Sequence, residues 1–276
     1  MTVRSDPHVG STLGLCPPEG VKVSEGSKFL PGNVLRWLWG RYLDYCRTAR
    51  RVIREHDAIH VDVWNGDFFD GDHHHTAQII SRNPENLAYI ADRVLGKTGT
   101  LKDYFSPAQR YVVIGTEVHV GPEGASEESV AKSIGAVKDP VRDSWAWWHL
   151  RLELNGVLLD FTHHPDTSGN LPHTRGQGAQ RQAFIIWSEH HLVGERHPDI
   201  AIRSHKHVFA DSGEHYPTRA IITPAWQLKT QFGFRVASGS LASVGGLIIV
   251  IPPNGDYRIL KNTLYRPDLP DPMRLA

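Results

Sequence analysis

Five short clusters of Asp, Glu and His indicate metal chemistry, because imidazole and carboxylate groups together are typical ligands of transition metals. The chain has 17 histidines among 276 residues but only two cysteines and two methionines. The spacings Asp-x-His and His-x-His direct two side chains to the same side of an extended backbone. With this many candidate ligands, we expect two metal ions rather than one. The clusters are Asp6-Pro7-His8, Gly66-Asp67-Phe68-Phe69-Asp70-Gly71, Gly115-Thr116-Glu117-Val118-His119, His163-His164-Pro165 and Ser204-His205-Lys206-His207.

Each cluster directly follows an expected strand. Short β-branched runs alternate with longer helical patterns, which is typical of an α/β sheet protein. In open α/β sheets, ligand-binding residues gather in loops at the carboxyl ends of strands, so the five clusters should converge. Asn155-Gly156 indicates a tight hairpin. The sequence predicts strands at 1–5, 58–64, 111–114, 146–154, 157–162, 199–203, 219–223, 246–251 and 257–260, and helices at 33–56, 84–95, 127–137 and 181–192.

The composition is that of an ordinary globular protein, with 40% apolar and 22% charged residues, which excludes disorder. Thirty basic residues balance thirty acidic ones, which argues against binding of nucleic acid through bulk charge. The longest apolar run, 247–251, is far short of the roughly 20 residues that span a bilayer. No signal peptide is visible, and two cysteines suggest a reducing compartment, so we expect a cytoplasmic protein. Without repeats or linkers, residues 1–276 are interpreted as a single domain.

In this order the clusters resemble the motifs of the calcineurin-like metallophosphoesterases. The opening Ser5-Asp6-Pro7-His8-Val9-Gly10-Ser11 is especially similar to the first motif of that family. The variant third motif and the chain length look most like phosphoesterases of phages and prophages, which implies a bacterial or phage-infected host cell. The resemblance covers residues 1–210. It implies a four-layer α/β/β/α sandwich of two mixed β-sheets flanked by helices, with the β-rich part at 211–276 belonging to the second sheet.

The resemblance also implies a role for each matching residue. Two divalent ions would be bound, with Mn²⁺ expected and Fe, Zn or Ni as alternatives. The first metal would be held by Asp6, His8 and His207, the second by His163 and His205, and Asp67 would bridge both. The family's ligand is the first His of a His-x-Pro element, so His163 is preferred; His164 then faces the substrate or lies beside the ligands, or is the ligand instead. Asp70 would assist by orienting a ligand or capping its loop.

The third motif departs from the family pattern, which is usually Gly-Asn-His followed by an acidic residue. No Asn is present in Gly115-Thr116-Glu117-Val118-His119. We hypothesise that Glu117 replaces the Asn as an oxygen ligand and that His119 is the general acid. Thr116 is the alternative ligand, although a neutral hydroxyl binds metal poorly. Replacing Glu117 with Ala should then lower the affinity for the second metal.

The implied reaction is hydrolysis of phosphodiesters or phosphomonoesters by direct attack of a metal-bridging hydroxide. His119 would protonate the leaving oxygen. The neutral charge slightly favours a small phosphodiester or nucleotide over DNA, although the fold does not choose among these substrates. His73 and His74 either face substrate at the mouth of the site or lie in a solvated loop. No membrane partner is expected, and the sequence leaves the oligomeric state open.

Three other functions remain as alternatives. The missing Asn is compatible with a catalytically impaired scaffold that binds a protein partner, although such a scaffold has no chemical need for the metal-ligand residues. A DNA nuclease of the same family is the second alternative. A metallohydrolase of carboxylic esters or amides is the third, and the order of the motifs disfavours it.

Overall fold

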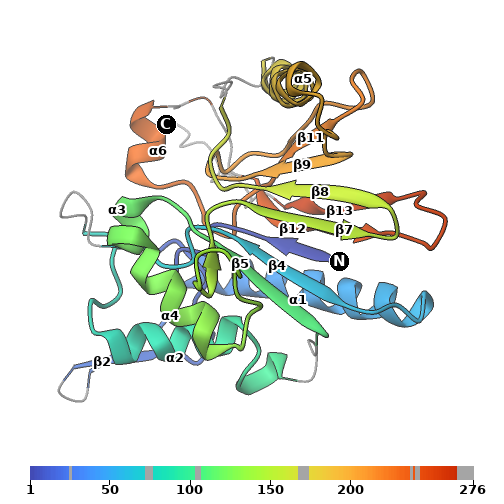
Figure 1. Cartoon of the computed structure of the whole chain (residues 1–276). Coiled ribbons are helices and arrows are strands. Elements are labelled where there is room, and N and C mark those ends of the chain that lie inside the picture. Colours follow the sequence, from blue (N-terminus) through green and yellow to red (C-terminus); the bar gives the residue numbers. More distant parts are fainter. Residues whose placement is uncertain are drawn as a thin grey trace, which may run out of the picture.

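The structure, a computed structural model, describes residues 1–24, 27–71, 77–102, 107–166, 174–236, 239 and 243–265. Two mixed β-sheets lie face to face (Figure 1). The six-stranded sheet has the order β13-β12-β1-β4-β5-β6, and the five-stranded sheet has the order β10-β11-β9-β8-β7. The strands of the first are β1 (Thr2–Arg4), β4 (Val61–Asn65), β5 (Gln109–Val113), β6 (Ala146–Trp147), β12 (Val244–Val250) and β13 (Arg258–Tyr265). Those of the second are β7 (Leu150–Leu154), β8 (Val157–Phe161), β9 (Ile200–Arg203), β10 (Ala210–Asp211) and β11 (Arg219–Ile222).

Helices cover the outer face of each sheet. Three helices, α1 (Asn33–Glu55), α2 (Pro84–Val94) and α4 (Ala125–Ser133), lie against the six-stranded sheet, and α5 (Arg175–Val193) lies against β10 and β11 (Figure 1). The expected four-layer α/β/β/α sandwich is therefore confirmed. The smaller elements are the hairpin of β2 (Val21–Ser24) and β3 (Ser27–Phe29), the helices α3 (Glu117–Val120) and α6 (Gln231–Val236), and the 3₁₀ turns η1 (Gly99–Leu101) and η2 (Pro122–Gly124).

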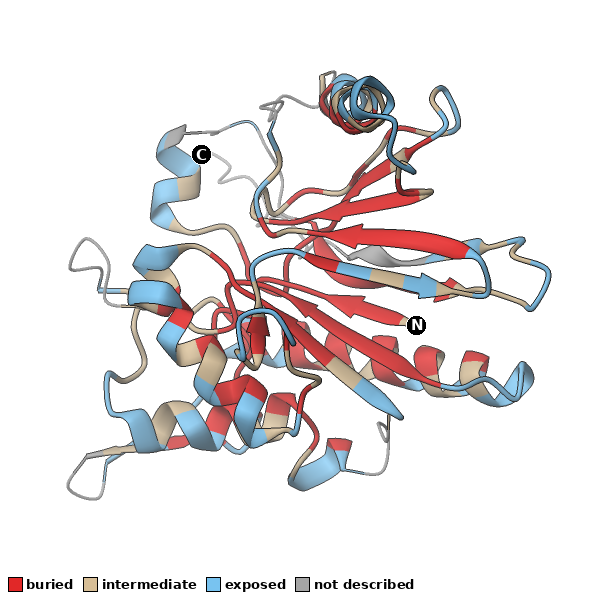
Figure 2. Cartoon of the chain, in the orientation of Figure 1, coloured by how far each residue is buried: buried red, intermediate tan, exposed pale blue. Residues whose placement is uncertain are grey.

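Two apolar layers hold the four structural layers together. Between the sheets, Val63 and Val113 of the six-stranded sheet pack in one cluster with Leu159 and Ile202 of the five-stranded sheet. Beneath the six-stranded sheet, α1 buries one stripe of side chains at helical spacing, while its other side faces solvent. Figure 2 shows the result as buried strands with helices exposed on their outer faces. None of the helices in the described ranges is both long and apolar enough to span a bilayer.

The four predicted helices are present, with ends that differ by a few residues from the prediction. The single strand predicted at 146–154 is wrong, because β6 pairs with β5 in one sheet whereas β7 pairs with β8 in the other. Trp148 and His149 connect the two sheets at this point. The β-rich residue pattern on either side of this crossing is the same, so it does not reveal the change of sheet. The hairpin at Asn155-Gly156 is confirmed, with φ of 48° and 81° at the two residues.

The β-rich tail is divided between the two sheets, in place of the single second sheet that was expected. Strand β11 lies in the five-stranded sheet, but β12 pairs antiparallel with β1, so that Thr2 lies opposite Ile248. Strand β13 continues the six-stranded sheet beyond β12. The tail therefore covers the otherwise open edge of β1, the strand that leads into the first cluster.

Parallel pairing brings the clusters to one end of the molecule. Strand β1 runs parallel to β4, and β4 runs parallel to β5, so the loops that follow them leave the same edge of the six-stranded sheet. Strands β8 and β9 are also parallel neighbours. Their following loops carry His163, His164, His205 and His207 to the loops of the first sheet.

Candidate metal centre

The loops after the strands have an unusual backbone at the candidate ligands. Nine non-glycine residues in the described ranges have positive φ, and five of them are Asp6, His8, Asp67, His205 and His207, with φ between 42° and 69°. A left-handed backbone costs free energy for residues with a Cβ atom, and such positions concentrate at functional sites. The strained backbone at these positions directs the candidate ligand side chains toward one another.

Two glycines leave room for the ligands to approach one another. A Cβ atom at Gly66 would lie 2.2 Å from Nδ1 of His163, and a Cβ atom at Gly115 would lie 2.2 Å from Oδ1 of Asp67. Both distances are shorter than any tolerated contact. The glycines of the second and third clusters are therefore needed because the loops pack directly against the ligand side chains.

One half of the centre contains Asp6, His8 and His207, whose candidate ligand atoms lie within 4.8 Å of one another. Nε2 of His207 is 3.3 Å from Oδ1 of Asp6 and 3.3 Å from Nε2 of His8. Nε2 of His8 is 4.0 Å from the same Asp6 oxygen. The structure thus brings together the three residues that were predicted to hold the first metal.

The other half contains Asp67, His163 and His205. Nε2 of His163 is 3.0 Å from Oδ2 of Asp67, and Nδ1 of His205 is 3.9 Å from the same oxygen. Nδ1 of His163 lies 2.8 Å from the carbonyl oxygen of Asn65, the last residue of β4. A proton on Nδ1 would be donated to that carbonyl, which leaves Nε2 facing the carboxylates as a potential ligand atom.

Asp67 and Asp6 connect the two halves. Asp67 forms one group with Asp6 and His163, and another with His8 and His119. Nε2 of His163 is also 3.8 Å from Oδ1 of Asp6. A carboxylate in this position can offer one oxygen to each of two ions, which is the role that was predicted for Asp67.

Buried atoms without hydrogen-bond partners test whether metal ions fit these residues. Both carboxylate oxygens of Asp6 and Nε2 of His163 are buried without a well-formed hydrogen bond within the described residues, and their close neighbours are the other carboxylate and imidazole atoms of the centre. Burying such groups without good hydrogen bonds is costly, whereas bound cations would satisfy them. Imidazole and carboxylate atoms are also the donors that divalent transition metals prefer. The residues therefore fit a divalent metal centre.

The pKa values of these groups reflect the same concentration of charge. Burial would raise the pKa of Asp67, but His163 and His205 hold it well below its usual range. Conversely, burial would lower the pKa of His163, but Asp67 and Asp6 raise it to about 10. The pKa of His164, whose ring is only partly shielded from solvent, falls to about 4 because of that partial desolvation and the neighbouring His163 and His205. Without metal, protons on imidazoles compensate the buried carboxylates.

His119 and Asp70 lie beside the first half. Nδ1 of His119 is 3.1 Å from Oδ1 of Asp70, and Nδ1 of His8 is 3.4 Å from the same oxygen. Burial lowers the pKa of His119, but the hydrogen bond with Asp70 and the nearby carboxylates raise it above its ordinary value. A carboxylate thus holds the ring of His119, and the roles predicted for both residues stay predictions.

The third cluster places Thr116, and not Glu117, beside the ligands. The backbone N–H and the hydroxyl of Thr116 donate to the two oxygens of Asp67 at 2.5 Å and 3.1 Å. Its hydroxyl oxygen is 3.1 Å from Nε2 of His164 and 3.2 Å from Nδ1 of His205. Glu117 begins α3 with an exposed side chain and belongs to none of the four ligand groups found among the described residues.

Glu127 of α4 is a buried residue of the site region that the sequence analysis missed. Its two oxygens accept from the backbone N–H groups of Phe68, at 3.1 Å, and Gly115, at 2.6 Å. Burial and the charge of Asp67 raise its pKa to about 8. One side chain therefore joins the loop after β4 to the loop after β5. No motif marks it, since it lies on a helix outside the clusters.

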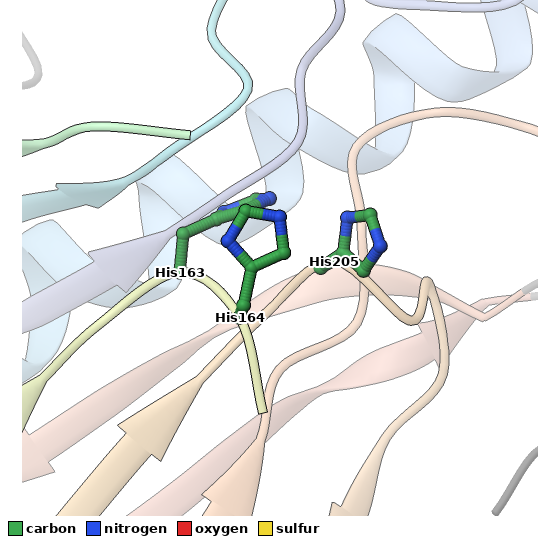
Figure 3. Close-up of side chains that lie close together, drawn as sticks. All are labelled: His163, His164 and His205. Atoms are coloured by element: carbon green, nitrogen blue, oxygen red, sulfur yellow. The ribbon is translucent and has the colours of Figure 1, made fainter. Parts of the chain in front are cut away.

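His164 lies with His163 and His205 in the remaining ligand group (Figure 3). Part of its side chain is open to solvent. The predicted substrate-facing residues His73 and His74 lie outside the described residues. Every other predicted site residue except Glu117 therefore belongs to one contiguous cluster in space.

Comparison with solved structures gives likenesses at low similarity. An archaeal phosphodiesterase has 11% sequence identity and a TM-score of 0.39, with 94% of this chain and 97% of that chain covered. A single mutant of Vps29 from Entamoeba histolytica has 10% identity and a TM-score of 0.39, with the same coverage. No family model and no curated protein matches the chain. At these values the likenesses identify neither reaction nor ligand, so the function is argued from the site itself.

Proposed function

We propose that this chain is a metal-dependent phosphoesterase with two divalent ions. The main support is the position of Asp67 and Asp6 between two sets of imidazoles, His8 with His207 and His163 with His205. Two adjacent ions, when bound, activate water as a nucleophile and neutralise the negative charge on a phosphoryl group. Phosphoester hydrolysis is a reaction that two cationic positions joined by a carboxylate serve well.

The protein residues supply orientation and proton transfer. Asp70 accepts from Nδ1 of His119, which fixes the ring and directs Nε2 away from Asp70. The hydrogen bond with Asp70 and the nearby carboxylates raise the pKa of His119 above its ordinary value, which favours the protonated ring. His119 donates that proton from Nε2 to the leaving oxygen, because an alkoxide leaves poorly without one.

The substrate that we favour is a small phosphodiester or nucleotide. The net charge of zero supports this choice, because tracking a DNA backbone requires several unpaired Lys or Arg side chains. Mn²⁺ is the metal expected from the sequence resemblance, and Fe, Zn and Ni have compatible ligand preferences. The cytoplasm of a bacterium or a phage-infected cell, and the phage-type grouping, stay predictions from the sequence.

The deciding experiment combines metal analysis with turnover. The purified protein should bind nearly two ions per chain and hydrolyse bis-p-nitrophenyl phosphate in the presence of Mn²⁺. An Asp67→Asn variant should retain the fold but lose most of both properties, whereas a His190→Ala variant, altered in α5 away from the centre, should retain both.

Two other results would point to different functions. Metal binding of one ion or none, with no turnover of either bis-p-nitrophenyl phosphate or p-nitrophenyl phosphate, would favour the protein-binding scaffold. Turnover of a carboxylic ester but of no phosphate ester would favour a hydrolase of another class.

A further inference from the structure

His163 and His164 are neighbours in sequence, yet both rings lie beside His205. Consecutive side chains of an extended strand point to opposite faces, but the chain bends after β8 ends at Phe161. The ring centroids are 4.8 Å apart for His163 and His164, 4.6 Å for His164 and His205, and 5.4 Å for His163 and His205. Figure 3 shows the three rings gathered next to the ends of β8 and β9.

One nitrogen from each ring lies within 4.8 Å of the others, close enough for the three to hold an ion after a small adjustment. The rings come from only two loops, and β8 and β9, which precede them, are hydrogen-bonded parallel neighbours. Their positions are therefore fixed by the sheet. The third cluster contributes no carboxylate here, because the side chain of Glu117 is exposed outside the group.

Thr116 explains how the histidines are held without acting as a strong ligand itself. Its hydroxyl donates to Asp67 and faces the nitrogens of His164 and His205 at 3.1 Å and 3.2 Å. A neutral hydroxyl is a weak metal ligand, but it can orient the carboxylate and the two imidazoles around an ion. The third motif of this chain has no Asn to act as a ligand, and the imidazole of His164 lies next to Thr116 of that motif.

We infer that His164 is a metal ligand of this chain, so that His163, His164 and His205 form a three-imidazole half of the centre beside Asp67. This inference rests on the proposed two-metal function. Its chemical consequence is selectivity: imidazole nitrogen suits Zn²⁺, Ni²⁺ and Fe²⁺, whereas Mn²⁺ prefers oxygen ligands. The half with Asp6, His8 and His207 has fewer imidazoles. The two halves should therefore differ in metal preference, with Zn²⁺ favoured over Mn²⁺ next to His164.

The test is titration of the metal-free protein with Co²⁺ and Zn²⁺, followed by visible absorption of Co²⁺ and by competition with a chelating dye. The wild-type protein should bind two ions. His164→Ala should weaken one of the two sites at least about tenfold and change the Co²⁺ spectrum, since even outer residues of a metal site contribute that much. Glu117→Ala and His190→Ala are matched controls and should leave both sites unchanged.

A measurement on the wild-type protein tests the inference even if the His164→Ala variant does not fold. Imidazole ¹⁵N resonances should show a ring nitrogen of His164 shifting on addition of Zn²⁺, together with those of His163 and His205. Unchanged affinity and spectrum in His164→Ala, with a weakened site in Glu117→Ala, would overturn the inference and restore the glutamate as the ligand.

These results separate the inference from the proposed function. Two bound ions and phosphoesterase activity, with His164→Ala binding metal as the wild type does, would refute the inference alone. Loss of one site in His164→Ala, with no phosphoester hydrolysed by the wild type, would refute the proposed function alone. A wild-type protein that binds no metal would refute both.

Discussion

Nδ1 of His119 lies 3.1 Å from Oδ1 of Asp70, a carboxylate that is itself buried in the loop after β4. The same oxygen lies 3.4 Å from Nδ1 of His8. Asp70 therefore orients a candidate proton donor and a candidate metal ligand at the same time. The hydrogen bonds from these two histidines outweigh burial and keep the pKa of Asp70 well below its usual range.

Replacement of His119 with Ala should reduce the turnover of diesters that have alkyl leaving groups by about 10²–10⁴-fold. The reduction should be much smaller for bis-p-nitrophenyl phosphate, because a nitrophenolate leaves as a stable anion and needs no proton. Steady-state kinetics with both kinds of substrate test this difference. Equal losses on both, with metal content unchanged, would mean that His119 is not the general acid.

Replacement of Asp70 with Asn should reproduce part of that loss. An Asn side chain still contacts His119 but lacks the charge that keeps a proton on the ring. The basic limb of the pH–rate profile should therefore move to lower pH. A profile of unchanged shape, with only its height reduced, would assign Asp70 a purely structural role in the loop.

The position of the site was predictable because it follows from strand topology. Loops that directly follow parallel strands of one sheet lie at the same end of that sheet. The side chains of Asp6 and Asp67 meet there, and His163 joins them from the second sheet. The helical pattern in 33–56 likewise predicted α1, since its apolar stripe faces a sheet. These features depend on patterns that repeat locally along the chain.

Other features depend on contacts that no local pattern records. The positive φ at Asp6 and His205 is imposed by the surrounding structure, since Asp and His tolerate this conformation better than most residues but still adopt it only rarely. Glu127 was missed because its partners are backbone N–H groups, which every sequence contains. The exposure of Glu117 was missed because α3 begins there and turns the side chain outward.

Glu127 and Glu128 are adjacent residues that offer a matched pair of substitutions. Glu127 accepts from Phe68 and Gly115 in the metal-site loops, whereas Glu128 accepts from the N–H groups of Trp145 and Ala146 before and in β6. A Gln at either position replaces one carboxylate oxygen with an NH₂ group. That group is a donor and cannot accept from the backbone N–H group that it faces. We expect both changes to lower the free energy of unfolding by about 1–3 kcal/mol.

Only Glu127→Gln should also weaken metal binding, by about 10–100-fold, because it releases the loops that position Asp67 and Thr116. Titration of metal at a temperature where both variants are folded separates the two effects. Equal metal affinities in Glu127→Gln and Glu128→Gln would show that Glu127 contributes to stability alone.

Metal removal should destabilise the protein, because in the described part of the chain Asp6 and His163 then keep buried polar atoms without well-formed hydrogen bonds. Adding metal at 100 times its dissociation constant should raise the free energy of unfolding by about 2.7 kcal/mol per site. Thermal melts with and without chelator measure this. Asp6→Asn should lose most of the increase, and an equal increase in that variant would place the ion elsewhere.

Asp160 of β8, which lies away from the metal centre, should make the free energy of unfolding depend on pH in the acid range. Its oxygens lie 2.5 Å from Nε2 of His149 and 2.8 Å from Nη2 of Arg203. Burial would raise its pKa, but the hydrogen bond with His149 and the charge of Arg203 lower it from 3.8 to about 2. Since the folded pKa is the lower one, the charged carboxylate stabilises the fold above pH 4, and this contribution is lost as pH falls through about 2.

Asp160→Asn should therefore be less stable than the wild type by about 2 kcal/mol at pH 6, and the difference should shrink towards zero near pH 2, where protonated Asp160 resembles Asn. Urea denaturation across this pH range measures the difference. Asp143→Asn, which alters an exposed ion pair with Lys138, is the control and should show little effect at any pH. A difference for Asp160→Asn that stayed constant from pH 6 to pH 2 would show that its contribution depends on shape and not on charge.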